Sequence, residues 1–183
     1  MDPITALDRT DSIVTDLIGQ LTPDHRHIAT PCDEWDMHDL IAHMCGGGHM
    51  IAGALQGEAP PDPVPDFLAD GPATGWTETV AHLRAAATPE ALAATHQLPF
   101  GEYPGAAAVS VIVADHLVHA WDMAKAADLP FAIDDDLAEW ALATWQQVVP
   151  PEGRSGPGFK DVVAVADGAS AIDRMAAYTG RRP

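Results

Sequence analysis

Two residues four positions apart, Asp115 and His119, have the spacing best suited to chemistry in this chain of 183 residues. They lie in a largely apolar run without proline or glycine, which predicts a helix over Ala106–Ala126. Four residues are about 400° of rotation on an α-helix, so both side chains would leave one face, one turn apart. A carboxylate and an imidazole placed in this way can bind one metal ion if a third ligand comes from elsewhere.

His43 is the candidate for that third ligand. It lies in a segment that we expect to be a second helix, entered through a tight turn with Asp33 as the N-cap, because its apolar residues recur at helical spacing: Met37, Leu40, Ile41 and Met44. A buried ionisable side chain needs a partner, and a metal ion can be that partner. Two imidazoles and one carboxylate form a common zinc or iron set that leaves positions open for water or substrate.

Three further residues keep alternatives open. His116 lies three residues before His119, on the flank of the same face, and is the first alternative ligand. Asp122 could accept a hydrogen bond from a ring nitrogen of His119 and so orient it. His49 could face the same cavity or solvent. An Asp-x-x-x-His spacing is also common by chance, and a single helical histidine is more often hydrogen-bonded in the core or solvated than metal-bound.

Nucleophilic catalysis has weaker support. Cys45 and His43 are two residues apart and would lie on different faces of their helix, which disfavours a Cys–His dyad. Cys32 precedes an expected helix N-terminus, where the helix dipole can lower a thiol pKa, but a small packed residue at a tight turn is the simpler interpretation. Ser110 lacks a G-x-S-x-G context. Two cysteines are too few for a disulfide framework.

The elements that would position these residues are helices joined by long connections. Apolar spacing predicts a four-helix bundle with a polar site in its core, from helices over Thr5–Leu21, the His43 segment, Trp76–Ala87 and Ala106–Ala126. Further helices are expected over Asp134–Val148 and Ala169–Tyr178. Between the main helices we expect a short helical turn or loop at Thr88 and a hairpin over Thr95–Pro104. A strand or extended segment is expected over Val162–Val165.

Three consecutive glycines, Gly46–Gly48, interrupt the second helix. Each costs roughly 1 kcal/mol relative to alanine, so the helix must bend or something must approach its backbone closely. Close packing of a neighbouring helix is the simpler explanation, and room for a ligand beside His43 is the functional one. Neither phosphate-binding glycine pattern is present.

Composition narrows the classes of function. The chain carries 27 acidic and 9 basic residues, a formal charge of −18, which argues against nucleic acid and anionic membranes as partners. The longest apolar stretches are broken by His, Asp or Gly well before the roughly 20 residues of a membrane span, and no basic-plus-apolar leader opens the chain. We therefore expect a single cytoplasmic domain over residues 1–183 that acts on a small molecule, as a monomer or homodimer.

Two segments resemble a known family. The segments Thr30–His43 and Asp115–Ala124 are similar to the two motifs of the mycothiol-dependent maleylpyruvate isomerase N-terminal domain, within the DinB/YfiT-like superfamily. Phe100–Gly105 and the ending Tyr178–Pro183 resemble an actinobacterial subgroup of uncharacterised metal-binding proteins. The resemblance spans nearly the whole chain.

This resemblance implies an all-α, up-down-down-up four-helix bundle with a short hairpin and a small C-terminal extension. It also implies a divalent metal, zinc or nickel, on His43, Asp115 and His119, with Asp115 where the isomerase usually has glutamate. The implied chemistry is thiol transfer or a related isomerisation with mycothiol as co-substrate, since a coordinated thiol is deprotonated. A metal-dependent hydrolase and a non-catalytic metal- or ligand-binding protein remain the alternatives.

Overall fold

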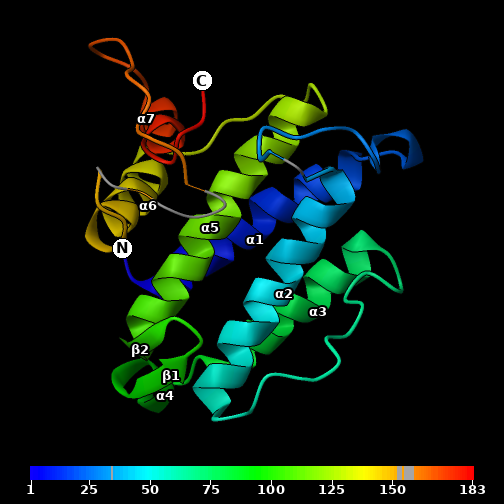
Figure 1. The fold of residues 1–183 in the computed structure, drawn as a ribbon, viewed down its shortest axis with the longest axis vertical. Coiled ribbons are helices and arrows are strands. Elements are labelled where there is room, and N and C mark those ends of the chain that lie inside the picture. The colour runs from blue at the N-terminus through cyan, green and yellow to red at the C-terminus, as the bar shows by residue number, and fades with distance from the viewer. Residues whose placement is uncertain (34, 152–153, 155–158) are drawn as a thin grey trace.

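The structure of the protein is a computed structural model, and it describes residues 1–33, 35–151, 154 and 159–183. Helices dominate this part of the chain, and its one sheet has two strands (Figure 1). The all-α prediction is therefore confirmed. None of the helices in the described ranges is long and apolar enough to cross a membrane.

Four long helices form the body of the fold: α1 (Pro3–Gln20), α2 (Met37–Gln56), α3 (Pro72–Ala86) and α5 (Gly105–Ala126). They contact one another in a ring, because α1 packs on α5 and α3 while α2 packs on α3 and α5 (Figure 1). Their apolar faces fill the space between them, with large buried side chains from each helix, including Leu7, Met44, Leu83 and Leu117.

Shorter elements extend this bundle at both ends of α5. A 3-10 turn (Pro23–His25) follows α1, and α4 (Pro89–Ala93) leads into the antiparallel strands β1 (Thr95–Leu98) and β2 (Gly101–Pro104), which confirms the predicted hairpin. Two further helices, α6 (Asp135–Val148) and α7 (Ala171–Tyr178), pack on each other and on α5. Residues 162–165 form no strand, but Val163 N–H donates to the carbonyl of Ala177, as an extended packing segment would.

The helix that carries Asp115 and His119 is covered on several sides. The bundle helices α1 and α2 contact α5, and α6 and α7 also lie against it (Figure 1). Every residue from 116 to 124 is buried as a result. Because polar groups in such a segment cannot reach water, each of them needs a partner within the protein.

The glycine run in α2 allows close packing and does not break the helix. Residues 37–56 form one continuous helix through Gly46–Gly48. A Cβ on Gly48 would lie 2.3 Å from Thr79 Cγ2 of α3, and one on Gly47 would lie 2.8 Å from Ile112 Cδ1 of α5. These side chains occupy the space beside Gly47 and Gly48, which supports the packing interpretation, while room for a ligand beside His43 stays a prediction.

Two predicted helix starts are wrong. Asp36, and not Asp33, caps α2, because Asp36 Oδ1 accepts a hydrogen bond from the N–H of Asp39 at 2.9 Å. Around this start, Met37 N–H donates to the carbonyl of Ile28, and Thr30 N–H donates to the carbonyl of Trp35. The third helix starts at Pro72, well before Trp76, since the fixed φ of proline suits the first turn and its missing N–H costs nothing there.

Candidate metal centre

The bundle brings His43, Asp115 and His119 together at the junction of α2 and α5. Nε2 of His43 lies 3.2 Å from Oδ2 of Asp115, and Nε2 of His119 lies 3.5 Å from Oδ1 of the same carboxylate. One ligand atom from each residue lies within 4.8 Å of the other two. The imidazole rings of the two histidines meet edge to face, 5.0 Å between centroids. This is a compact set of two nitrogens and one carboxylate that could hold a metal ion.

Helix geometry explains the arrangement. Asp115 and His119 are one turn apart on α5, so their side chains leave the same face, and α2 crosses that face at His43. His119 is buried, whereas the side chain of His43 keeps 37% of its surface exposed and that of Asp115 keeps 19%. The cluster is therefore closed on the His119 side and accessible from the His43 side.

The second nitrogen of His119 is held by a buried carboxylate. Nδ1–H of His119 donates to Oδ2 of Asp122 at 3.0 Å. This hydrogen bond fixes the ring orientation and directs Nε2 toward Asp115. Two acceptors, a nitrogen lone pair and a carboxylate oxygen, then face each other across 3.5 Å, an arrangement that requires a proton or a cation between them.

Arg181, close to the C-terminus, completes this chain of contacts. Its Nη2–H and Nε–H donate to Oδ2 and Oδ1 of Asp122 at 2.8 and 3.2 Å, and Nη1–H donates to the carbonyl of Thr179. Both side chains are buried, with 6% of Arg181 and none of Asp122 exposed. The bidentate pair keeps Asp122 ionised in the protein interior, so that it acts only as an acceptor toward His119.

The charge states follow from burial and from these neighbours. Burial would raise the pKa of Asp115, but the adjacent His119 and His43 hold it well below its ordinary value. Burial would lower the pKa of His119, but the carboxylates of Asp115 and Asp122 raise it to about 9. Burial would also raise the pKa of Asp122, but the hydrogen bonds and charges of His119 and Arg181 lower it below its ordinary value. The site therefore favours positive charge between its carboxylates.

The loop before α2 covers the cluster from one side. The ring of Trp35 lies 4.5 Å from that of His43 and 5.8 Å from that of His119, centroid to centroid. Thr30 holds the loop closed, since its hydroxyl donates to the carbonyl of Trp35 at 2.9 Å. The turn that the sequence indicated as a structured helix entry thus also forms a wall of the site.

Cys32, Asp122 and His119 form a second group with metal-binding atoms close together. This group is a poorer candidate, because both oxygens of Asp122 already accept hydrogen bonds from Arg181. Burial also raises the pKa of the Cys32 thiol, which opposes formation of the thiolate that binds metals. The interpretation of Cys32 as a packed residue is the one the structure favours.

The other predicted histidines lie elsewhere. Nε2 of His116 is 3.0 Å from the carbonyl of Met44, and its ring packs against Trp76. Burial lowers the pKa of His116 to about 4, so it is a neutral core residue whose Nε2–H donates to the α2 backbone. His49 stacks on Phe67 and lies 2.9 Å from Nδ1 of His82, outside the cluster.

The role of Arg181 has no counterpart among the sequence predictions. Arg181 lies 59 residues from Asp122, and no local spacing connects the two. The indirect signals are its place in the Tyr178–Pro183 ending, which resembles the actinobacterial subgroup, and its presence in an acidic chain with few cations. Trp35 is likewise missing from the site residues predicted from the sequence, and only the folded structure shows that it contacts both histidines of the cluster.

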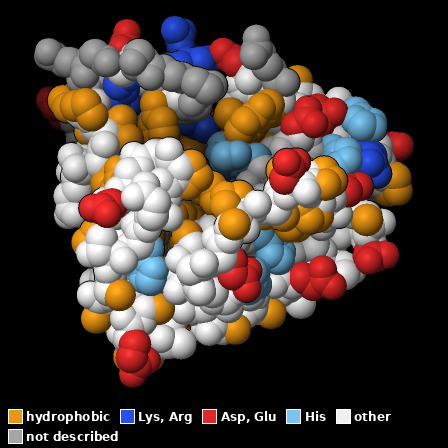
Figure 2. All heavy atoms as spheres, turned by 60° about the horizontal axis from the view of Figure 1, so that its bottom comes forward, with side chains coloured by type: hydrophobic (Ala, Val, Ile, Leu, Met, Phe, Trp, Pro, Cys, Tyr) orange, Lys and Arg blue, Asp and Glu red, His pale blue; other side chains and the backbone are white. Residues whose placement is uncertain are grey.

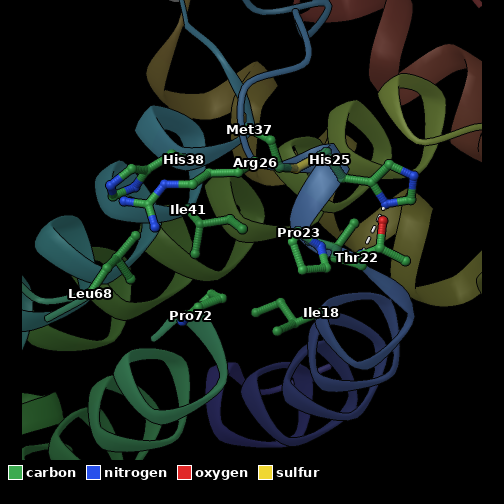
Figure 3. Close-up of a pocket in the computed structure, with 11 residues that line it drawn as sticks. Ile18, Thr22, Pro23, His25, Arg26, Met37, His38, Ile41, Leu68 and Pro72 are labelled. Atoms are coloured by element: carbon green, nitrogen blue, oxygen red, sulfur yellow. Dashed lines mark hydrogen bonds between the residues drawn. The ribbon is translucent and has the colours of Figure 1, made fainter. Parts of the chain in front are cut away.

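A separate pocket of about 360 Å³ lies between the end of α1, the start of α2 and the start of α3 (Figure 3). Its walls are mainly apolar, with Ile18, Ile41, Leu68 and Pro72 around the opening and Arg26 and His38 at one side. None of the three residues of the cluster lines it. The pocket and the candidate metal centre are thus distinct features.

The fold and the cluster define an all-α protein with a two-histidine, one-carboxylate site between bundle helices. The model of the mycothiol maleylpyruvate isomerase N-terminal domain family matches residues 7–124, and the chain belongs to this family. The matched range contains all three residues of the cluster but not Arg181.

Two relatives are similar over almost their full length. Uncharacterised proteins from Mycobacterium tuberculosis strains CDC 1551 / Oshkosh and ATCC 25618 / H37Rv are each 34% identical over 183 residues, which is 99% of this chain and 98% of theirs. No solved structure matches the chain at a significant level.

Proposed function

We propose that this protein is a divalent-metal-dependent enzyme that joins a low-molecular-weight thiol of the mycothiol type to an electrophilic small molecule. His43, Asp115 and His119 would hold the metal, with zinc or nickel as the expected ion. The observation that supports this most directly is the convergence of Nε2 of both histidines on the Asp115 carboxylate. Membership of the isomerase N-terminal domain family supports the choice of thiol.

The donor set fits such an ion. Two neutral imidazoles and one carboxylate are a usual set for catalytic zinc, with positions left for exogenous ligands. A divalent ion in this set supplies a Lewis acid that lowers the pKa of a coordinated thiol. The exposed edge at His43 is the route by which a thiol and its co-substrate would enter.

The geometry indicates a role for each of three residues around the cluster: Asp122, Arg181 and Trp35. Asp122 holds the proton on Nδ1 of His119, so that Nε2 presents its lone pair to the site. Arg181 keeps Asp122 ionised and in place. Trp35 shields the two histidine rings on one side and limits the access of water there.

Metal content and thiol consumption test this proposal together. Purified wild-type protein should hold close to one equivalent of zinc or nickel by mass spectrometry, and His119→Gln should lose it. His49→Gln is the matched control, because His49 also lies on a bundle helix but outside the cluster. The wild type and His49→Gln should consume mycothiol in the presence of alkyl halides or unsaturated carbonyl compounds, whereas His119→Gln should not.

Each departure from that pattern has a definite meaning. One equivalent of metal with no thiol consumption across the electrophiles would reject the enzyme and leave a metal-binding protein. Hydrolysis of esters or amides without thiol would indicate an enzyme that activates water. Absence of metal from all variants, with melting unchanged by chelators, would reject the metal site itself.

A further inference from the structure

The distribution of positive charge is unusual for so acidic a protein. The chain has only 9 Lys and Arg residues against 27 Asp and Glu. Both of its lysines, Lys125 and Lys160, and two of its arginines, Arg181 and Arg182, line one pocket of about 650 Å³ between α5 and the C-terminal segment. Figure 2 shows most Lys and Arg side chains of one face gathered at one end, while acidic side chains are spread over it.

Cations remain in excess at this pocket after their partners are counted. Asp161 is the one carboxylate among its lining residues. Lys160 pairs with Asp33, and Arg181 pairs with Asp122. Within the described ranges, neither Lys125 nor Arg182 has a carboxylate partner; Lys125 lies over the ring of Trp121 at 5.2 Å. This local excess of cations would attract an anion, in contrast to the strongly negative remainder of the molecule.

The pocket is distinct from the candidate metal centre but adjoins it. Trp121 and Lys125 lie on a face of α5 about 120° around the helix from Asp115 and His119. Pro31 and the 160–163 segment also line the pocket. Arg181 connects the pocket with the candidate metal centre, since it lines the pocket and donates to Asp122, which accepts from His119. A ligand in this pocket would therefore contact a different face of α5 from the one that carries Asp115 and His119.

We propose that this pocket is a binding site for a small dianion that carries phosphate or carboxylate groups. Lys125 and Arg182 would provide the first charged contacts, and the guanidinium of Arg182 is able to bind two oxygens at once. The Lys160–Asp33 pair is solvent-exposed, with 58% and 68% of the side chains accessible, and such pairs are weak enough for Lys160 to turn to a ligand. The proposal does not depend on a metal at His43, Asp115 and His119.

Calorimetric titration with inorganic phosphate and with succinate tests the site, using full-length protein freed of metal by a chelating resin. One equivalent of dianion should bind at low ionic strength, and added salt should weaken it. The preference for phosphate or for succinate distinguishes the two ligand chemistries. Arg182→Gln and Lys125→Gln should each weaken binding about tenfold, the loss of one charge-assisted contact.

Arg26→Gln is the matched control, because it removes one positive charge at the other pocket. Its affinity should stay within about twofold of wild type. Trp121 locates the ligand: a fluorescence change on binding should disappear in Trp121→Phe while the heat of binding remains. Circular dichroism confirms that the variants fold. No binding of either dianion tighter than about 10 mM would overturn the proposal, as would equal weakening in Arg26→Gln.

Discussion

The guanidinium of Arg181 bonds to both carboxylate oxygens of Asp122, a residue 59 positions earlier, and both side chains are buried. Asp122 in turn accepts the Nδ1–H of His119. The C-terminal segment thus determines how a residue of the candidate metal centre is oriented. Arg181 follows the residues matched by the family model, whereas Asp122 lies within them.

Removal of the Arg181 charge should destabilise the fold strongly. Arg181→Gln leaves the Asp122 carboxylate buried without its partner, and the free energy of unfolding should fall by about 3–5 kcal/mol in urea denaturation. Arg182→Gln, at an exposed neighbouring position, should change it by less than about 0.5 kcal/mol. The double variant Asp122→Asn/Arg181→Gln should recover part of the loss, and strictly additive effects would contradict the pairing.

Asp122 should tune metal affinity without being a ligand. In Asp122→Asn the partner of His119 Nδ1–H becomes neutral, and such changes typically cost 10- to 100-fold, roughly, in metal affinity. Competition with a chromophoric chelator measures the effect. Asp39→Asn, at the start of α2, is a control that should retain wild-type affinity. An unchanged affinity in Asp122→Asn would show that the hydrogen bond plays no part in metal binding.

The metal-free protein should lose stability toward alkaline pH because of His119. Its pKa is raised from 6.5 to about 9 by Asp115 and Asp122 against the opposing effect of burial. A histidine whose pKa is higher in the folded protein than in the unfolded chain stabilises the folded state. This stabilisation is fully present below the pKa of the unfolded chain, and it is lost as the pH rises to the pKa of the folded protein. The free energy of unfolding should therefore decrease, by on the order of 3 kcal/mol, between about pH 6.5 and pH 9.

Urea denaturation of chelator-treated protein across this pH range measures that decrease. His119→Gln should show a much flatter profile, because glutamine does not titrate. An equal slope in the wild type and in His119→Gln would assign the pH dependence to other groups and show that His119 is not held protonated between its two carboxylates.

Two glycines of α2 should respond to alanine in opposite directions. Gly48→Ala places a methyl group 2.3 Å from Thr79 Cγ2 at a close helix contact, and overpacking of this kind costs about 1–3 kcal/mol. At Gly53 the nearest atoms lie 3.7 Å away, so Gly53→Ala should gain up to about 1 kcal/mol from helix propensity. Thermal denaturation of both variants gives the comparison. Stabilisation of both would show that α2 and α3 are not closely packed at Gly48.

Much of the fold follows from patterns that are local in the sequence. Apolar spacing located the long helices to within a few residues, and the turn residues located the β1–β2 hairpin. The helix starts were harder to predict, because Asp33 and Asp36 are equally suitable caps as residue types. Only the hydrogen bonds of the loop, such as Thr30 to Trp35, determine which of them begins α2.

The sequence by itself determined that Asp115 and His119 share a face, because the repeat of the α-helix places residues four apart in register wherever the helix lies. The sequence also offered His43 as the third residue and His116 as the alternative, and the tertiary structure decided between them. His43 meets Asp115 across 72 residues, while His116 is turned toward the Met44 carbonyl. Arg181 reaches Asp122 only because the C-terminal segment returns to α5. Such contacts depend on how whole helices pack, and local spacing carries no information about that.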